Sequence, residues 1–520
     1  WQNIRKVGED IIATQLLFPH NHIIRPYDLG ALIAAGVFNV SVYKIPKVMI
    51  IPTGTEIISH RDVADFGQLK KNQIIDSNSI TLSGLVREAH GEPHVLDITP
   101  DDESAIRNVL LQASGSDADL ILMIAGSSAG SRDYTSAILS DIGEVLVHGV
   151  AMMPGKPTIL GAVNGKPVIG IPGYPVSAIL AFEQFAKPLL LSLQGMPAPK
   201  EHTIAVRASR AIPSKLGSEE FVRVNIGRVV NLTVATPLPR SAGSITTLTR
   251  AEGIIRIPSF SEGINQDEEI QAELLVDEEE LKNTIVVIGS HDITIDILAD
   301  EIRNATGRNI RISSGNVGSL GGLMAIKKGI CHFAGSHLLD TQTGEYNISY
   351  IKRYLKGIGI SLFHLVRRDQ GLIIKKNNPK GIRGITDLTR DDISYVNRQA
   401  GSGTRILLDY NLARSGIKAG SVKGYDYEEF THMSVAVDVL SGAADCGMAI
   451  YAAAKALDLD FIPMDTEQYD LVIPTDLLKD ENIQAVLSTI RSQKFRDRVT
   501  ALGGYDPSRS GELAAEITPG

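Results

Sequence analysis

The stretch Val48-Met49-Ile50-Ile51-Pro52-Thr53-Gly54-Thr55-Glu56 sets the pattern of the first half of the chain. In it, a short apolar run leads directly into a loop of small, hydroxyl-bearing and acidic residues. Similar apolar runs occur at residues 95–98, 120–124 and 168–171, and apolar residues recur at helical spacing between 82 and 89. Strands that alternate with amphipathic helices are typical of a parallel sheet covered by helices, so an α/β fold is expected here.

The loops that follow these strands are the candidate ligand-binding segments. They comprise residues 53–56, 99–102, 125–133 and 172–177. Because ligands of open parallel sheets bind outside the carboxyl ends of the strands, we expect the four loops to converge on one edge. The Gly- and Ser-rich segment 125–131 lets backbone N–H groups approach an anion, and its place after a buried strand favours phosphate binding over an ordinary turn.

Other polar residues in or near these loops have a structural interpretation beside the functional one. Asp101 and Asp102 follow Thr99-Pro100, where acidic residues stabilise the first turn of any helix, and local physics alone favours that role. Lys156 could hold an oxyanion, although a lysine on a surface hairpin is locally the safer interpretation. Ser177 is either a helix cap or a ligand contact.

Length and composition limit the function classes. A chain of 520 residues is too long for one core, and its net charge of -9 argues against broad nucleic-acid binding. The sequence has two cysteines, Cys331 and Cys446, and one disulfide could not stabilise a chain of this size. We expect both cysteines to be buried and the protein to be located in the cytoplasm. No membrane span is expected, because charged and polar residues break the most apolar helix pattern, 176–193. The chain opens on Trp1, so we expect a fragment.

The residue pattern of the sequence changes twice along the chain. Prolines stop the helix pattern after residue 195, and short alternating runs between 204 and 275 predict a small antiparallel barrel or sandwich. The acidic run 277–280 is typical of a solvated hinge. We therefore predict a remnant of an N-terminal domain over 1–45, an α/β domain over 46–195, a β-barrel over 203–276 and a second α/β domain over 283–515.

The last domain carries three hydroxyl-rich loops at strand ends. Each loop precedes a helix, and together they place free N–H groups and hydroxyls at three helix N-termini. Three capped helices are the structural alternative, but the repetition favours a site for a small oxyanion. The expected contacts are Ser290, Ser319, Ser402, Gly403, Thr404 and Arg405. A transition-metal site at Cys331, His332 and His337 is less expected, because their spacing matches no standard ligand pattern.

A string of short motifs carries a family resemblance across residues 1–275. Ile51-Pro52-Thr53-Gly54-Thr55-Glu56-Ile57, Asp76-Ser77-Asn78-Ser79, Pro100-Asp101-Asp102, Gly155-Lys156-Pro157 and Gly173-Tyr174-Pro175-Val176-Ser177 occur in this order. In this order they resemble the molybdopterin molybdenumtransferase family, the MoeA-type insertase domain also found in gephyrin. The resemblance implies a three-layer, parallel-sheet molybdopterin-binding domain followed by that family's C-terminal barrel.

The resemblance also implies the reaction and the roles of residues. Molybdate would be inserted into adenylyl-molybdopterin with release of AMP, assisted by Mg²⁺. Glu56, Asp101 and Lys156 fall on active-site positions, and Asp101 with Asp102 would hold the metal ion. The pterin nucleotide would lie across Thr53, Gly54, Asp76, Ser128, Gly130, Asp133, Pro172, Gly173 and Ser177. A homodimer is implied when the N-terminal region is present.

Two departures from the family pattern concern charge. Thr55 stands where the family usually has an acidic residue, and Met153 replaces the first of two lysines. They keep open an alternative, a non-catalytic pterin-binding protein regulated by an oxyanion-sensing domain.

A second resemblance covers residues 283–515. Asn378-Pro379-Lys380-Gly381-Ile382 and Gly401-Ser402-Gly403-Thr404-Arg405 resemble the type II periplasmic-binding-protein-like domain, whose two lobes close on a ligand. The resemblance implies a two-lobed α/β fold. Molybdate and tungstate are the expected ligands, and a cofactor precursor or the finished cofactor is a weaker option.

Overall fold

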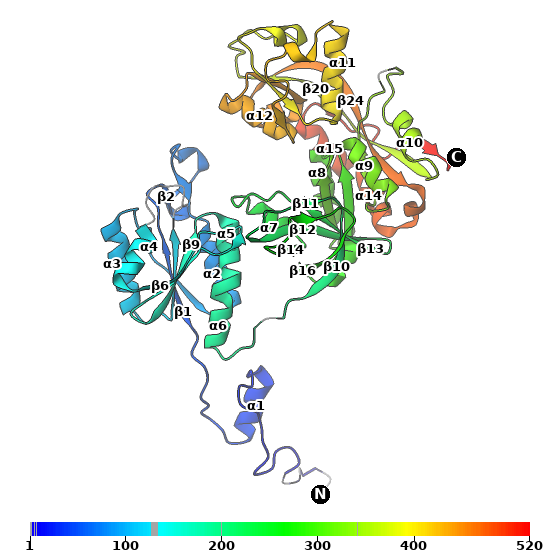
Figure 1. Ribbon diagram of the computed structural model, residues 1–520. Coiled ribbons are helices and arrows are strands. Elements are labelled where there is room, and N and C mark those ends of the chain that lie inside the picture. The colour runs from blue at the N-terminus through cyan, green and yellow to red at the C-terminus, as the bar shows by residue number, and fades with distance from the viewer. Residues whose placement is uncertain are drawn as a thin grey trace.

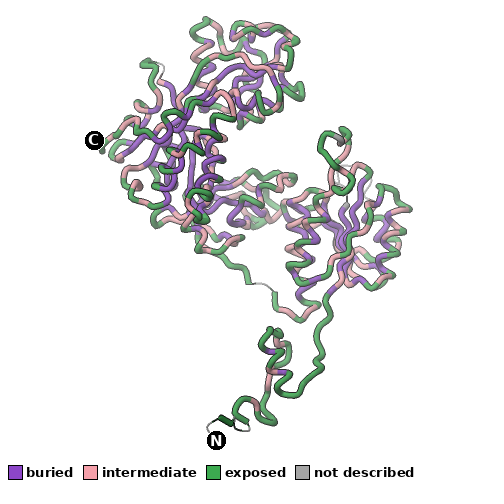
Figure 2. Tube along the Cα trace, turned by 180° about the vertical axis from the view of Figure 1, so that it is seen from behind, coloured by how far each residue is buried: buried purple, intermediate pink, exposed green. Residues whose placement is uncertain are grey.

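The computed structural model describes residues 3–4, 6, 8–125, 134–198, 200–340 and 342–519. It shows three domains in a chain-order series, preceded by an N-terminal segment that carries α1 (Pro26–Ala34) (Figure 1). The burial view shows a purple interior in each of the three domains and green, exposed connections before and after the first one (Figure 2).

The first domain is a sheet between two helical layers. Its strand order is β4-β1-β5-β9-β8-β6, and β4, β1, β5 and β9 run parallel, as expected. At the other end of the sheet, β8 pairs antiparallel with both β9 and β6, and the sequence pattern did not predict this edge. The strands are β1 (Lys47–Pro52), β4 (Glu92–Val95), β5 (Leu120–Ala125), β6 (Glu144–His148), β8 (Ile159–Val163) and β9 (Lys166–Pro172).

Each face of this sheet has its own apolar core. One core joins the sheet to α2 (Asn78–Glu88) and to the continuous helical run α5, η3 and α6 (Pro175–Ala181, Phe182–Ala186 and Lys187–Leu193). The other joins it to α3 (Glu103–Gly115) and α4 (Tyr134–Ile142). The run Pro175–Leu193 is long and apolar enough to cross a membrane by composition, but half of it is buried and its apolar side chains pack on the sheet. Two short strands, β2 (Ile57–Ile58) and β3 (Ile74–Ile75), lie in the loop after β1, with the 3-10 turns His60–Asp62 and Phe66–Gln68 between them.

The second domain is a closed five-stranded barrel. Its order is β13-β10-β16-β14-β12, and β12 pairs again with β13 to close the circle. The pairs are antiparallel except β10 with β13, which confirms the expected small barrel. The strands are β10 (Thr203–Ala208), β12 (Glu219–Val229), β13 (Leu232–Pro237), β14 (Gly253–Ile257) and β16 (Glu269–Leu274), accompanied by β11 (Ile212–Pro213), β15 (Gly263–Ile264) and α7 (Thr246–Arg250).

The barrel contacts the first domain through β7 (Met152–Met153), which pairs with β12. Met152, Val176, Leu180, Phe221 and Ile254 form one apolar cluster across this contact.

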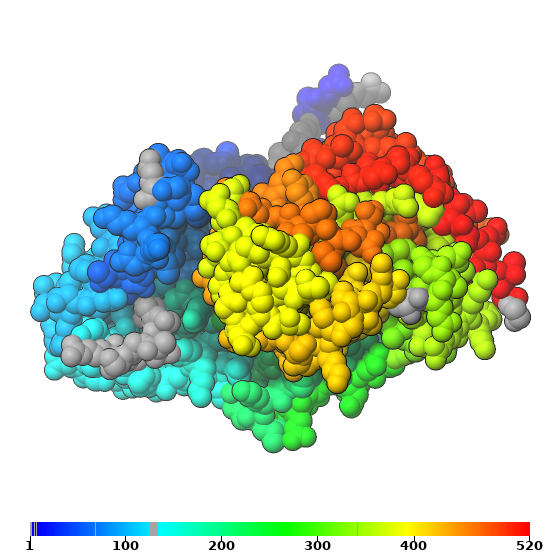
Figure 3. Space-filling model, turned by 90° about the horizontal axis from the view of Figure 1, so that it is seen from above, coloured from blue at the N-terminus to red at the C-terminus, as the bar shows by residue number. Residues whose placement is uncertain are grey.

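The third domain is built around two long strands that pair antiparallel, β20 (Ile360–Ile374) and β24 (Asp460–Pro474). They belong to an eight-stranded sheet. Six of its strands follow the order β19-β24-β20-β23-β21-β22, and the other two, β25 and β26, pair with β20. Strands β17 and β18 form a separate parallel pair. This confirms the two-lobed α/β fold. Figure 3 shows its residues, coloured yellow to red, as a continuous surface.

The remaining elements of this domain cover the two lobes. The strands are β17 (Thr284–Gly289), β18 (Arg311–Asn316), β19 (Ala334–Ser336), β21 (Tyr395–Arg398), β22 (Glu428–Glu429), β23 (Cys446–Ile450), β25 (Tyr505–Asp506) and β26 (Leu513–Ile517). The α-helices are α8 (Ile293–Thr306), α9 (Gly318–Lys327), α10 (Ile348–Tyr354), α11 (Gly403–Arg414), α12 (His432–Ser441), α13 (Tyr451–Ala456), α14 (Glu481–Arg491) and α15 (Gln493–Leu502). The 3-10 turns are Ile385–Thr389, Ala419–Ser421 and Thr475–Lys479.

The acidic run after the barrel is not the solvated hinge that its composition predicted. Residues Glu278–Asn283 form a 3-10 helix whose Leu281 is buried in the barrel core. Glu278 pairs with Arg228 of β12 at 3.2 Å, and Glu280 pairs with Arg311 of β18 at 2.8 Å. Acidic side chains therefore bridge the two domains, because basic partners on both sides compensate their charge.

Candidate functional site

The loops that follow the parallel strands of the first domain meet at one edge of the sheet. Thr53, directly after β1, bridges Thr99 in a parallel pairing. The Asn78 side-chain amide at the start of α2 donates to the Gly173 carbonyl at 2.7 Å. Segments 53–56, 99–102 and 172–177 therefore lie together at the edge of the sheet that β2 marks in Figure 1, and we refer to this loop edge as the crevice. Ser128, Gly130 and Asp133 lie outside the described residues.

The turn at Thr53 and Gly54 is tightly held. The Thr53 hydroxyl donates to the Ile124 carbonyl at 2.8 Å, and the Gly54 N–H donates to the Thr99 carbonyl at 3.0 Å. Gly54 has a φ of 145°, and a Cβ on it would lie 2.5 Å from Cγ1 of Ile57. Only glycine fits here, which lets the backbone come close to a ligand.

The acidic residues of the crevice divide into caps and carboxylates that cap no helix among the described residues. Asp102 is the N-cap of α3, since its Oδ1 accepts from the Ala105 N–H at 2.9 Å, and Asp76 accepts from the Ser79 N–H at 3.0 Å. Asp101 is exposed, and its backbone N–H donates to Thr55 Oγ1 at 3.3 Å. Glu56 is half-buried. In the described part of the chain, no group of three or more His, Cys, Asp or Glu side chains gathers in a metal-binding arrangement. Mg²⁺ needs only one or two carboxylates when substrate phosphates complete its shell, so Asp101 and Asp102 fit such an ion.

Lys156 and Ser177 belong to the same edge. Lys156 lies just before β8, which runs antiparallel to β9, so the start of β8 lies beside the carboxyl end of β9. Its side chain is exposed. Ser177 is the third residue of α5 and is buried, and Pro172 and Gly173 lead from β9 into that helix.

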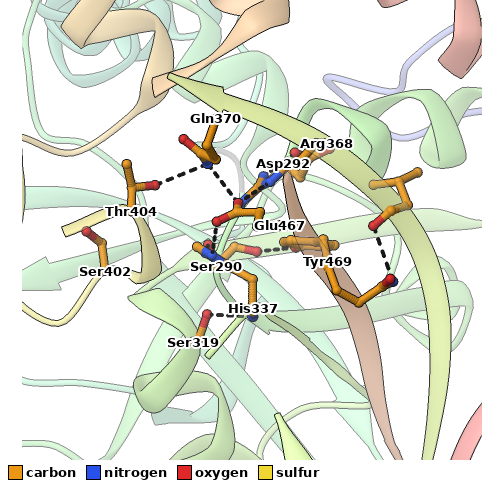
Figure 4. A network of polar contacts seen from close by, with 12 residues as sticks. Ser290, Asp292, Ser319, His337, Arg368, Gln370, Ser402, Thr404, Glu467 and Tyr469 are labelled. Atoms are coloured by element: carbon orange, nitrogen blue, oxygen red, sulfur yellow. Dashed lines mark hydrogen bonds and ion pairs between the residues drawn. The ribbon is translucent and has the colours of Figure 1, made fainter. Parts of the chain in front are cut away.

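In the third domain, a buried polar network lies between the lobes (Figure 4). His337 is at its centre: Ser290 Oγ lies 2.8 Å from its Nε2, Glu467 Oε2 lies 3.1 Å from its Nδ1, and its backbone N–H donates to Ser319 Oγ. A Cβ on Gly403 would lie 2.2 Å from Nδ1 of His337, so the N-terminus of α11 packs directly on the imidazole ring. Thr404 Oγ1 accepts from Gln370 at 3.4 Å.

The charges of this network fix its protons. Burial alone would raise the pKa of Glu467, but the paired Arg368 guanidinium outweighs burial and holds that pKa at about 2. Burial lowers the pKa of His337 despite the Glu467 carboxylate, so the imidazole is neutral. An ionised carboxylate only accepts, so Nδ1 of His337 carries the proton and Nε2 accepts from the Ser290 hydroxyl.

The structure brings five of the six expected oxyanion contacts to this network or to the helix N-termini beside it, but it places Arg405 elsewhere. The Arg405 guanidinium pairs with Glu428 and stacks over the Tyr425 ring at 4.4 Å. Ser402 caps α11 by accepting from the Arg405 N–H at 3.3 Å. The cationic side chain near the network is Arg398 rather than Arg405. Arg398 is 4% exposed and, among the described residues, has no carboxylate within ion-pair distance. Its guanidinium donates instead to the Glu429 and Phe430 carbonyls.

Several members of the network were missed in the sequence. Arg368 and Gln370 alternate on one face of β20, and Glu467 and Tyr469 do so on β24. Charged residues inside otherwise apolar strands are the signal that could have identified them, because a buried charge needs a partner. Cys331 and Cys446 are free and buried, as expected, and burial raises the pKa of the Cys331 thiol to about 12.

The comparisons with known proteins divide the chain in the same way. Residues 49–192 match the family described as a probable molybdopterin binding domain, residues 205–275 match the MoeA C-terminal region (domain IV), and residues 299–491 match a PBP superfamily domain.

Three curated relatives show how far the similarity extends. An uncharacterized protein of Bacillus subtilis, YvgK, is 38% identical over 233 residues, which cover 44% of this chain and 74% of that protein. A putative molybdopterin biosynthesis protein of Methanocaldococcus jannaschii is 32% identical, covering 53% of this chain and 66% of its own length. The molybdopterin molybdenumtransferase of Haemophilus influenzae is also 32% identical, covering 43% of this chain and 54% of its own length.

The chain thus spans between half and two-thirds of the length of these two molybdopterin proteins. The matched families follow the domains that the structure shows, and the crevice lies within the first match. The first two domains are therefore MoeA-type molybdopterin domains, and they are fused to a PBP-like domain.

Proposed function

We propose that the chain acts in molybdenum or tungsten cofactor biosynthesis, and that its first domain inserts molybdate into adenylyl-molybdopterin with release of AMP. The observation that carries this proposal is the convergence of segments 53–56, 99–102 and 172–177 on one edge of the sheet. The match of residues 49–192 to a probable molybdopterin binding domain, and the 32% identity to a molybdopterin molybdenumtransferase, support it.

The crevice residues would contact different parts of the substrates according to their charge. Thr53, Gly54 and the N-terminus of α5 with Ser177 would hold the nucleotide phosphates, and Asp76, Ser128, Gly130, Asp133, Pro172 and Gly173 would complete the pterin-nucleotide site. Lys156 would hold an anion, and Glu56 and Asp101 would lie near the molybdate. When bound, Mg²⁺ neutralises phosphate charge, and Asp101 and Asp102 are the residues that would hold it.

The experiment that tests the insertion reaction follows the nucleotide. Incubation of the protein with adenylyl-molybdopterin, molybdate and Mg²⁺ is expected to release AMP only when molybdate is present, as measured by chromatography. An intact nucleotide after incubation would instead support the alternative, a pterin-binding protein with an oxyanion-sensing domain, which Thr55 and Met153 favour.

For the PBP-like domain we propose binding of a small oxyanion between the lobes, in a cytoplasmic protein. Arg398 supports this, because a buried guanidinium that pairs with no carboxylate among the described residues attracts an anion. Burial, and after it the charge of Arg368, lowers the pKa of Arg398 to about 10. The N-termini of α9 and α11 add backbone N–H groups.

Calorimetric titration of the full chain with molybdate, tungstate and sulfate tests this second proposal. The full chain is needed because the third domain shares an apolar core with the barrel. Binding of molybdate and tungstate but not sulfate is the expected result, and binding of none of them would contradict an oxyanion site.

A further inference from the structure

A second cavity opens on the first domain beside the crevice. Its volume is about 540 Å³, and its lining includes residues of α2, the 3-10 turn His60–Asp62, residues 95–98 and Pro52. Pro52 directly precedes Thr53, where we place the nucleotide phosphates. The volume is in the range of pockets that bury a whole small organic molecule.

One face of α2 forms a wall of this cavity. Ser79, Ser83 and Arg87 follow each other at four-residue spacing, so they lie on the same side of the helix. Ser79 is 3% exposed and Ser83 is 6% exposed. Within the described chain, neither hydroxyl oxygen has a hydrogen-bond partner. Buried hydroxyl groups are normally paired, and these two line an open space from which a ligand could pair with them.

The charged groups of the cavity are mixed in sign. Two guanidinium groups, Arg61 and Arg87, and three carboxylates, Asp62, Asp76 and Asp97, line it, and two positive with three negative charges give -1. None of the five belongs to an ion pair among the described residues. This balance disfavours a bare oxyanion and suits a ligand that offers several donors and acceptors of its own.

We propose that this cavity binds the pterin ring of the substrate, an inference that rests on the proposed function. The 2-amino-4-oxo edge of a pterin carries an amine and a ring N–H side by side, which a carboxylate such as Asp97 accepts as two parallel bonds. Its oxo group and ring nitrogens accept from Ser79, Ser83 and Arg87. Adenine lacks the paired amine and ring N–H, so the carboxylates discriminate between the two ends of the nucleotide.

Fluorescence titration of the full chain with pterin (2-amino-4-oxopteridine), and in parallel with AMP, tests the assignment. Ser83→Ala and Asp97→Asn are each expected to weaken pterin binding about five- to tenfold and to leave AMP binding unchanged. Because the Ser83 hydroxyl has no partner among the residues that the structure describes, Ser83→Ala should keep or raise the unfolding temperature.

Ser114→Ala is the matched control. Ser114 is equally buried on α3, but its hydroxyl bonds the Leu111 carbonyl at 3.0 Å, so its removal should lower stability and leave pterin binding intact. Pterin binding that neither cavity variant weakens, or AMP binding without pterin binding, would overturn the cavity assignment alone. Absence of both AMP and pterin binding would overturn the proposed function as well.

Discussion

Gly227 of the barrel lies directly against Val286 of the PBP-like domain: a Cβ on Gly227 would lie 2.3 Å from Cγ2 of the valine. The close approach belongs to an apolar cluster shared by both domains, which includes Val229, Val234, Val286 and Ile288. Since the acidic run is also pinned by ion pairs on both sides, the barrel and the nearer lobe form one packed unit. Any closure of the two lobes would therefore move the lobe that carries α11 and α12.

Gly227→Ala should loosen this joint. Val286 is buried and short, so the new methyl group forces the strands apart at a cost of about 1–3 kcal/mol. Calorimetry should show a lower unfolding temperature, and limited proteolysis should cut faster between residues 275 and 284. Gly420→Ala, where a Cβ meets nothing within 4 Å, is the control. Equal proteolysis of the two variants would show that the joint tolerates separation.

Glu252 should make stability depend on pH near neutrality. It is 4% exposed in the barrel, and burial raises its pKa from 4.5 to about 7, although its side chain accepts from the Ile226 N–H. A carboxyl whose pKa is higher in the folded than in the unfolded protein binds its proton more tightly when folded. Its contribution is therefore present below pH 4.5 and lost as pH rises through 7, on the order of 3 kcal/mol.

Urea unfolding at pH 5 and pH 8 measures this loss. Glu252→Gln keeps an acceptor for the Ile226 N–H and carries no charge, so its stability should change less between the two pH values than that of the wild type. Parallel changes in both proteins would assign the pH dependence to other groups.

What the sequence predicted well depends on local patterns. The crevice edge follows from strands that each end in a loop, and the capping role weighed for Asp102 is fixed by residues within one turn. The network around His337 joins it to Glu467, 130 residues away, and strand pairing alone brings them together. The direction of Arg405 depends on Glu428 and Tyr425, and the joint depends on packing between domains. Such long-range contacts leave no local pattern, so composition predicted a solvated hinge where a rigid joint exists.

Asp102 should reveal separate capping and charge roles. Asp102→Ala removes the cap of α3 and should cost about 1 kcal/mol of stability, whereas Asp102→Asn caps equally well. If Asp102 helps to hold Mg²⁺, the asparagine variant should unfold like the wild type but need a Mg²⁺ concentration at least roughly tenfold higher for AMP release. An unchanged Mg²⁺ requirement in Asp102→Asn would leave Asp102 a cap only.

Arg398 and Arg405 offer a matched pair for the oxyanion site. Arg398 is buried and forms no ion pair with a carboxylate in the described part of the chain, whereas Arg405 pairs with Glu428. Arg398→Gln should therefore weaken molybdate binding by more than roughly tenfold in calorimetric titration, because loss of a charge-assisted contact costs about 1.5–3 kcal/mol. Arg405→Gln should leave the affinity within about twofold. Arg398→Lys keeps the positive charge and should retain most of the affinity. This variant separates the effect of lost charge from the effect of losing the hydrogen bond that Arg398 donates to the Phe430 carbonyl. Wild-type affinity in Arg398→Gln would show that the helix N-termini alone hold the anion, and the neutral donors at Ser319 and Thr404 would then be the groups to test.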